Sequence, residues 1–198
     1  LRTLTRVVIQ ATNALSISVS PEISRAYGAE DFDLLRILYR RLSQASTWIG
    51  LVSFVVLFFA GPWIMSAWTG GRIGAPNPLF LLLLAVVLVN SWWWGSLSLL
   101  YASNRHEGLS LAYIAANLAA IMLVLPLTGL FGVAGAASAL LVSEIAIAIY
   151  TIVRANALVD ESPAAYIGIS LSPPLYLIGQ IRELVAAVRG RIGRGRRE

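Results

Sequence analysis

The sequence predicts an all-α integral membrane protein, a bundle of about five transmembrane helices. Of the 198 residues, 58% are hydrophobic and 13% are charged, whereas soluble domains carry roughly a quarter charged residues. The mean hydropathy is +0.75. Because one crossing needs about 20 apolar residues, the chain has room for several spans joined by short loops and none for a large soluble domain.

Uncharged segments between short charged or glycine-rich turns define the predicted spans. We expect Pro21 to end the first span, and Gly61-Pro62 to be tolerated near the end of the second because neighbouring helices satisfy the freed carbonyls. Between these spans, residues 22–41 are charged and carry leucines at helical spacing, which predicts a loop with a short interfacial helix. The spans cover about residues 1–20, 46–68, 79–101, 109–127 and 133–153.

The remaining residues, 156–198, differ in character from the transmembrane lobe at 1–155. Pro173-Pro174 interrupts an uncharged stretch, so we expect an interfacial or re-entrant segment rather than a sixth straight helix. A basic amphipathic helix is expected to follow, with its arginines facing anionic lipid. The net charge of +5 arises largely from this tail and from short loops, so it predicts membrane topology and no nucleic-acid partner.

Arginine distribution predicts the orientation, since loops rich in basic residues stay in the cytoplasm. The first span should therefore enter from outside and the C-terminus should lie inside. The chain begins at Leu1 without methionine or a signal peptide, so we expect it to be part of a longer protein. The arginine-rich side carries Arg25, Arg36, Arg40, Arg41, Arg105, Arg154 and six tail arginines, and the other side carries Arg2 and Arg72.

Glu144 is the most informative candidate, because a carboxylate inside an apolar span costs about 2.5 to 3.5 kcal/mol unless it is protonated, paired or hydrated. It is interpreted either as a site for a coupling proton or cation, or as a buried hydrogen-bond partner of a Ser or Asn on the next helix. Both interpretations stay open. The chain has no cysteine and one histidine, so we expect neither a metal site nor a cofactor.

Four other residues are candidates for binding substrate. Arg6 lies near the start of the first span and either contacts a phosphate or reaches the outer interface. Asn13, Asn90 and Asn117 fall inside three separate spans, where amides line a polar cavity or fasten helices together. The run Trp92 to Trp94 covers most of a helix circumference, which allows sugar stacking, packing or lipid contact.

Three stretches resemble a known family: PEISRAYG at 21–28, Gly61-Pro62 through the WTG at 68–70, and GVAGAA at 132–137 running to Ser143-Glu144. In order, spacing and predicted sidedness they are similar to the polysaccharide transporters of the multidrug/oligosaccharidyl-lipid/polysaccharide exporter superfamily. The resemblance covers about residues 1–155. It implies most of the C-terminal six-helix lobe of a two-lobe flippase in the bacterial inner membrane.

That resemblance implies transport of an undecaprenyl-diphosphate-linked oligosaccharide by alternating access, for O-antigen or exopolysaccharide biosynthesis, with no covalent catalysis. The expected partners are the lipid-linked oligosaccharide, membrane lipids and other polysaccharide-assembly proteins. A drug/cation antiporter of the same superfamily is the alternative. A membrane-embedded glycan-assembly enzyme ranks below both, because the outer turns are short and hold no cluster of catalytic residue types. A fourth possibility is an assembly subunit without transport activity.

Overall fold

The computed structural model describes residues 2–71 and 78–175, and within these ranges the chain is helical with no strand. The predicted all-α class is therefore confirmed. The described helices are α1 (Arg2–Gly28), α2 (Phe32–Thr69), α3 (Pro78–Ala102), α4 (Leu109–Phe131), α5 (Val133–Leu158) and α6 (Pro163–Leu171).

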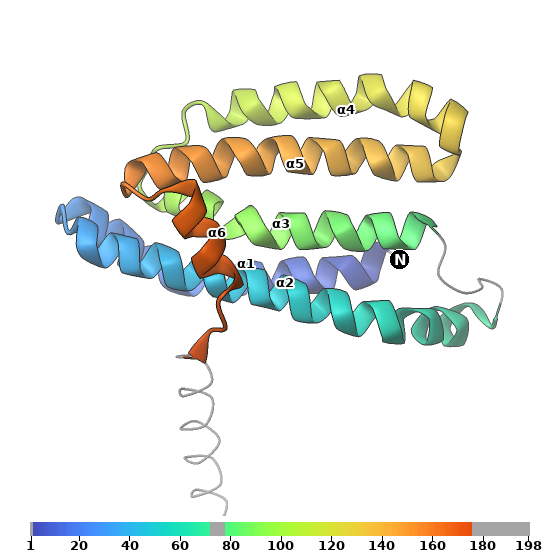
Figure 1. Cartoon of the computed structure of the whole chain (residues 1–198), viewed down its shortest axis with the longest axis horizontal. Helices are drawn as coiled ribbons and strands as arrows, with labels where there is room; N and C mark the ends of the chain where they lie inside the picture. The colour runs from blue at the N-terminus through green and yellow to red at the C-terminus, as the bar shows by residue number, and fades with distance from the viewer. Residues whose placement is uncertain (1, 72–77, 176–198) are drawn as a thin grey trace, which may run out of the picture.

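The long helices α1 to α5 run side by side along the longest axis of the molecule, each opposite in direction to the one before (Figure 1). α3 lies between the α1–α2 pair and α5, and α4 packs on the outer side of α5. The short helix α6 lies across the bundle and packs on α2. α3 is accordingly rich in buried residues, among them Trp93 and Leu99 at 1% and 0% exposure.

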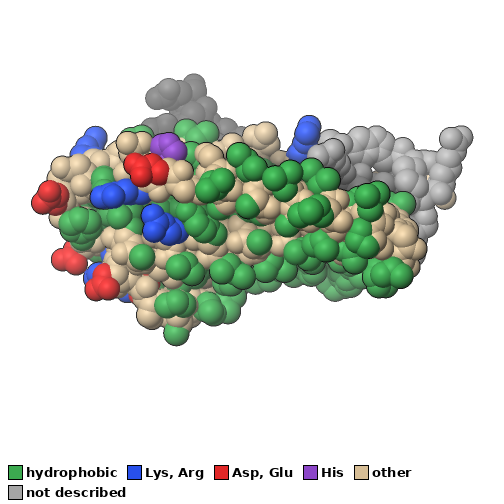
Figure 2. All heavy atoms as spheres, turned by 90° about the horizontal axis from the view of Figure 1, so that it is seen from above, with side chains coloured by type: hydrophobic (Ala, Val, Ile, Leu, Met, Phe, Trp, Pro, Cys, Tyr) green, Lys and Arg blue, Asp and Glu red, His purple; other side chains and the backbone are tan. Residues whose placement is uncertain are grey.

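Charged side chains gather at one end of the bundle, while hydrophobic ones dominate the rest of the face in Figure 2. We call this end, formed by residues 22–41, 103–107 and 154–161, the charged end. Beyond it, most large exposed side chains are apolar, as at Phe59, Leu125 and Ile149 with 75%, 79% and 61% exposure, and Arg6 is an exception. An apolar belt of this kind is what lipid requires of a spanning bundle.

In the described part of the chain, four helices are long and apolar enough to cross a membrane. This finding supports an integral membrane protein, and the helices α2 to α5, to which the four segments belong, each contain one predicted span. α1 holds residues 2–20 of the predicted first span but is not among the four. Polar residues interrupt its apolar ones, so its crossing stays a prediction. The four segments are Phe32–Ile64, Pro78–Ala102, Leu109–Phe131 and Val133–Leu158.

The expectation that Pro21 ends the first helix is wrong. α1 continues through Pro21 to Gly28, although proline cannot donate the backbone hydrogen bond of that turn. Ile23 and Ala26 lie beyond the proline and are 0% and 2% exposed in the main core. Burial of these side chains offsets the missing bond, so the helix persists where the local signal predicts a stop.

The predicted loop with a separate interfacial helix at 22–41 is also wrong. Only residues 29–31 separate α1 from α2, and Asp31 caps α2 by accepting a 3.0 Å hydrogen bond from the Leu34 N–H. From there α2 continues without a break for 38 residues. Leu38 and Leu42 are buried, so the helical spacing of the leucines reflects the core-facing side of one long helix.

After α5, the chain turns back onto the bundle instead of forming a sixth long helix in the described residues. α6 has nine residues, with Pro163 in its first turn and Ser162 capping it through a 3.1 Å bond from the Ala165 N–H. The predicted basic helix that follows lies outside the described residues.

α2 and α3 approach each other closely at small residues. A Cβ atom on Gly95 would lie 2.8 Å from Ser43 Cα, and one on Gly50 would lie 2.8 Å from Ser91 Oγ. Both distances are below normal contact, so a larger side chain at either glycine would separate the helices. Small residues commonly permit such backbone approach in membrane bundles.

Replacing Gly95 by alanine should destabilise the protein by about 2 kcal/mol, because the overpacking exceeds the gain of roughly 1 kcal/mol in helix propensity. Gly129→Ala on α4 is the matched control, since nothing lies within 4 Å of the added Cβ. Unfolding of the purified protein in detergent measures both changes. Equal stability of the two variants would contradict the tight crossing.

Candidate functional site

A groove of about 720 Å³ is lined by residues of α1, α3 and α4. α1 supplies polar residues spaced three or four apart, which places them on one helix face. α3 and α4 supply three aromatic side chains. The lining comprises Asn13, Ser16, Ile17, Ser20, Pro21, Ser24, Trp94, Leu97, Ser98, Tyr101 and Tyr113.

The chemistry of the groove is polar but uncharged, since no charged side chain is among the described residues that line it. Three of its hydroxyls are already held by the backbone: Ser16 Oγ donates to the Thr12 carbonyl at 3.1 Å, Ser98 Oγ to the Trp94 carbonyl at 2.9 Å, and Ser24 Oγ to the Ala102 carbonyl at 2.8 Å. The Ser24 bond joins the end of α1 to α3. The groove therefore offers an amide, hydroxyl oxygens and aromatic rings to a ligand.

Glu144 lies near the middle of α5 and is partly buried. Its Oε2 accepts hydrogen bonds from Trp93 Nε1 at 3.1 Å and from Asn90 Nδ2 at 3.3 Å. Both donors come from α3, the helix against which α5 packs. The hydrogen bond to a neighbouring asparagine, one of the two interpretations of Glu144, is present; the coupling role stays a prediction.

Trp93 connects this carboxylate to the groove. Its ring centre lies 5.9 Å from that of Trp94 and 6.0 Å from that of Tyr113, and both of these rings line the groove. Aromatic pairs at such separations are in favourable contact. Glu144 therefore lies one aromatic ring behind the groove, although it is not among the residues that line it.

The candidate binding residues do not meet at one place. Asn13 lines the groove, whereas Asn90 is 8% exposed and is bonded to Glu144. Asn117 is exposed on α4, and its Nδ2 donates to the Tyr113 carbonyl at 2.8 Å within its own helix. Arg6 is exposed near the start of α1, opposite the charged end.

Sequence reasoning missed most of the groove. Tyr101 and Tyr113 were not among the candidates, and Trp94 was only one of three adjacent tryptophans. A signal was nevertheless present in α1, where Asn13, Ser16, Ser20 and Ser24 recur at helical spacing. That pattern indicates one polar face on α1.

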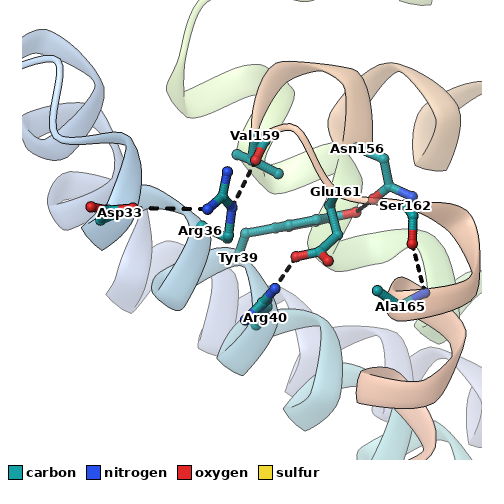
Figure 3. Close-up of polar contacts among 9 residues, drawn as sticks. All are labelled: Asp33, Arg36, Tyr39, Arg40, Asn156, Val159, Glu161, Ser162 and Ala165. Atoms are coloured by element: carbon teal, nitrogen blue, oxygen red, sulfur yellow. Dashed lines mark hydrogen bonds and ion pairs between the residues drawn. The ribbon is translucent and has the colours of Figure 1, made fainter.

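A second polar cluster lies at the charged end and joins α2 to α3, α5 and the chain after it (Figure 3). The Tyr39 hydroxyl donates to Asn156 Oδ1 at 2.8 Å and lies 2.9 Å from Ser96 Oγ. The Arg40 guanidinium pairs with Glu161 at 2.6 Å, and Arg36 Nε donates to the Val159 carbonyl at 2.9 Å. The cluster is best explained as a structural fastening of these helices.

Comparison of the chain with protein-family models, curated proteins and solved structures finds no match. The resemblance to polysaccharide transporters therefore rests on the three sequence stretches, and its functional consequences depend on what the groove and Glu144 support.

Tyr39→Phe should lower the free energy of unfolding by about 1 to 2 kcal/mol, because Asn156 Oδ1 loses its donor in a buried setting. Tyr150→Phe is the control, since the Tyr150 hydroxyl has no hydrogen bond within the described ranges. Thermal unfolding in detergent compares the two. If both variants lose the same stability, the buried hydroxyl network does not fasten α2.

Proposed function

We propose that the chain is most of the C-terminal lobe of a lipid-linked oligosaccharide flippase of the bacterial inner membrane, with the charged end in the cytoplasm. The observation that carries the proposal is the uncharged, hydroxyl- and aromatic-lined groove in a membrane bundle. Sugars present hydroxyl groups around their edges and apolar C–H faces, so Asn and Ser side chains match the edges and aromatic rings match the faces.

In this proposal each part of the site has a separate role. Asn13 and Ser20 bind sugar hydroxyls from α1, and Trp94, Tyr101 and Tyr113 contact the sugar faces from the opposite wall. The lipid tail remains in the bilayer beside the apolar belt. No covalent step takes place, because the work is movement of a polar headgroup past a hydrocarbon layer.

Glu144 is the proposed coupling site in the same scheme. Its ionisation alters the hydrogen bond to Trp93, and Trp93 contacts two rings of the groove wall. A ligand that moves these rings thus changes the surroundings of the carboxylate. By linkage, ionisation of Glu144 changes the affinity of the groove for that ligand. Arg6 lies near the start of α1, away from the charged end, and is proposed to bind the pyrophosphate when the headgroup reaches the outer side.

A drug/cation antiporter is the second candidate, and one observation favours it. An aromatic groove with a carboxylate behind it also suits an organic cation, through contact of the cation with ring faces. Transport of a fluorescent organic cation by the full-length protein in proteoliposomes separates the two. Efflux of the cation without translocation of lipid-linked oligosaccharide would favour the antiporter.

Asn13→Ala should reduce oligosaccharide translocation by the full-length protein roughly tenfold, because one hydrogen bond in the groove is lost. Asn117→Ala removes the same side chain outside the groove and should leave translocation unchanged. The assay follows lipid-linked oligosaccharide across proteoliposome membranes at equal protein content. Equal activity of both variants and the unmodified protein would refute the groove as the sugar site.

Glu144→Gln should abolish the dependence of translocation on the ion gradient while the protein still folds, because glutamine keeps an oxygen for Trp93 and Asn90 but does not ionise. Translocation is measured with and without an imposed proton or sodium gradient. Glu144→Ala tests the structural contribution and should also lower thermal stability. A Gln variant with full gradient dependence would refute the coupling role.

A further inference from the structure

A small cavity at the charged end joins the α3–α4 turn to the last turns of α5. Its volume is about 170 Å³, and Leu100, Arg105, Arg154, Ala157 and Leu158 line it. The three α5 residues are spaced so that they share one helix face. Arg105 is held beside them by a 2.8 Å bond from its backbone N–H to the Leu100 carbonyl. Two guanidinium side chains and three apolar ones thus line one cavity.

The two arginines retain donors for a ligand. Arg105 Nε donates to the Tyr27 hydroxyl at 2.9 Å, and this bond raises the pKa of the Arg105 guanidinium. The bond occupies Nε and fixes the side chain, but it does not involve the two terminal nitrogens. Arg154 is exposed and makes no hydrogen bond or ion pair with the residues that the structure describes.

The charge of the cavity is unbalanced. No acidic side chain is among the described residues that line it, and Glu107, two residues after Arg105, is exposed and lies outside the lining. A neighbouring cavity of about 300 Å³ provides the contrast, because Arg25 shares it with Glu22 and Asp31. Arg25 thus shares its cavity with two carboxylates, whereas the lining of the Arg105–Arg154 cavity holds none among the described residues, and Glu107 acts on Arg105 from outside it.

We propose that the Arg105–Arg154 cavity binds the phosphate headgroup of an anionic phospholipid. Guanidinium groups offer paired donors that match phosphate oxygens, and basic pockets between helices at the membrane surface bind such headgroups. The site lies where the apolar belt meets the charged end. It does not depend on which substrate the groove transports.

The surface next to the cavity favours a lipid over free phosphate. From Ala157 toward the middle of the bundle, α5 presents an exposed apolar side chain every four residues. These are Val153, Ile149 and Ile145, at 54%, 61% and 42% exposure. This row supplies a track for an acyl chain whose headgroup lies between the two arginines.

Native mass spectrometry of the purified full chain, titrated with dioleoyl phosphatidylglycerol or dioleoyl phosphatidylcholine, tests the site. Arg154→Gln should weaken phosphatidylglycerol binding roughly fivefold and leave phosphatidylcholine binding unchanged. Arg154 makes no described bond, so this variant should fold as the unmodified chain does. Arg25→Gln, the matched control at the same end, should bind phosphatidylglycerol normally.

Two results would overturn the proposal. If Arg154→Gln and Arg105→Gln both keep the affinity of the unmodified chain for phosphatidylglycerol, the anionic lipid binds elsewhere. If inorganic phosphate displaces phosphatidylglycerol at comparable concentrations, the cavity recognises free phosphate and the acyl track contributes nothing. Loss of affinity in Arg154→Gln with no displacement by phosphate supports the lipid site.

Discussion

The close contact between α2 and α3 is the constraint on which the rest of the bundle depends. Because Gly95 lies against Ser43 and Gly50 against Ser91, α3 fits between α1, α2 and α5. From this central position it presents Asn90 and Trp93 to Glu144 and Trp94 to the groove. A wider separation of α2 and α3 would displace both the carboxylate cluster and the aromatic wall.

The polar residues of α1 explain both its low hydropathy and its place in the groove. The polar residues that keep α1 outside the four clearly apolar segments include Asn13, Ser16, Ser20 and Ser24, and these same residues line the groove. Hydroxyls inside a bundle are tolerated when the backbone of their own or a neighbouring helix accepts their hydrogen bonds. Ser16 and Ser24 both donate to backbone carbonyls in this way, so the groove is polar without a buried charge.

The positions of the helices could be predicted from hydropathy, but their packing could not. Glu144 was recognisable because a charge interrupts an apolar run, whereas its partner Asn90 lies 54 residues away and depends on which faces of α3 and α5 meet. Pro21 misled the prediction because the cost of its lost hydrogen bond can be judged from the local sequence. The burial of Ile23, which offsets that cost, depends on how distant helices pack. Tyr39 lies in a charged segment, where nothing in the pattern indicates its two distant partners.

The fastening at the charged end has a consequence for biosynthesis. Arg36, Tyr39, Arg40 and Gln44 lie early in α2, yet their partners in the α5–α6 region follow 123, 117, 121 and 128 residues later. During synthesis these four side chains emerge before the groups that satisfy them exist. Since such long-range contacts form last, this end of the bundle closes only when residues 156–172 have left the ribosome, and a chain interrupted before that point would leave these four side chains without their partners.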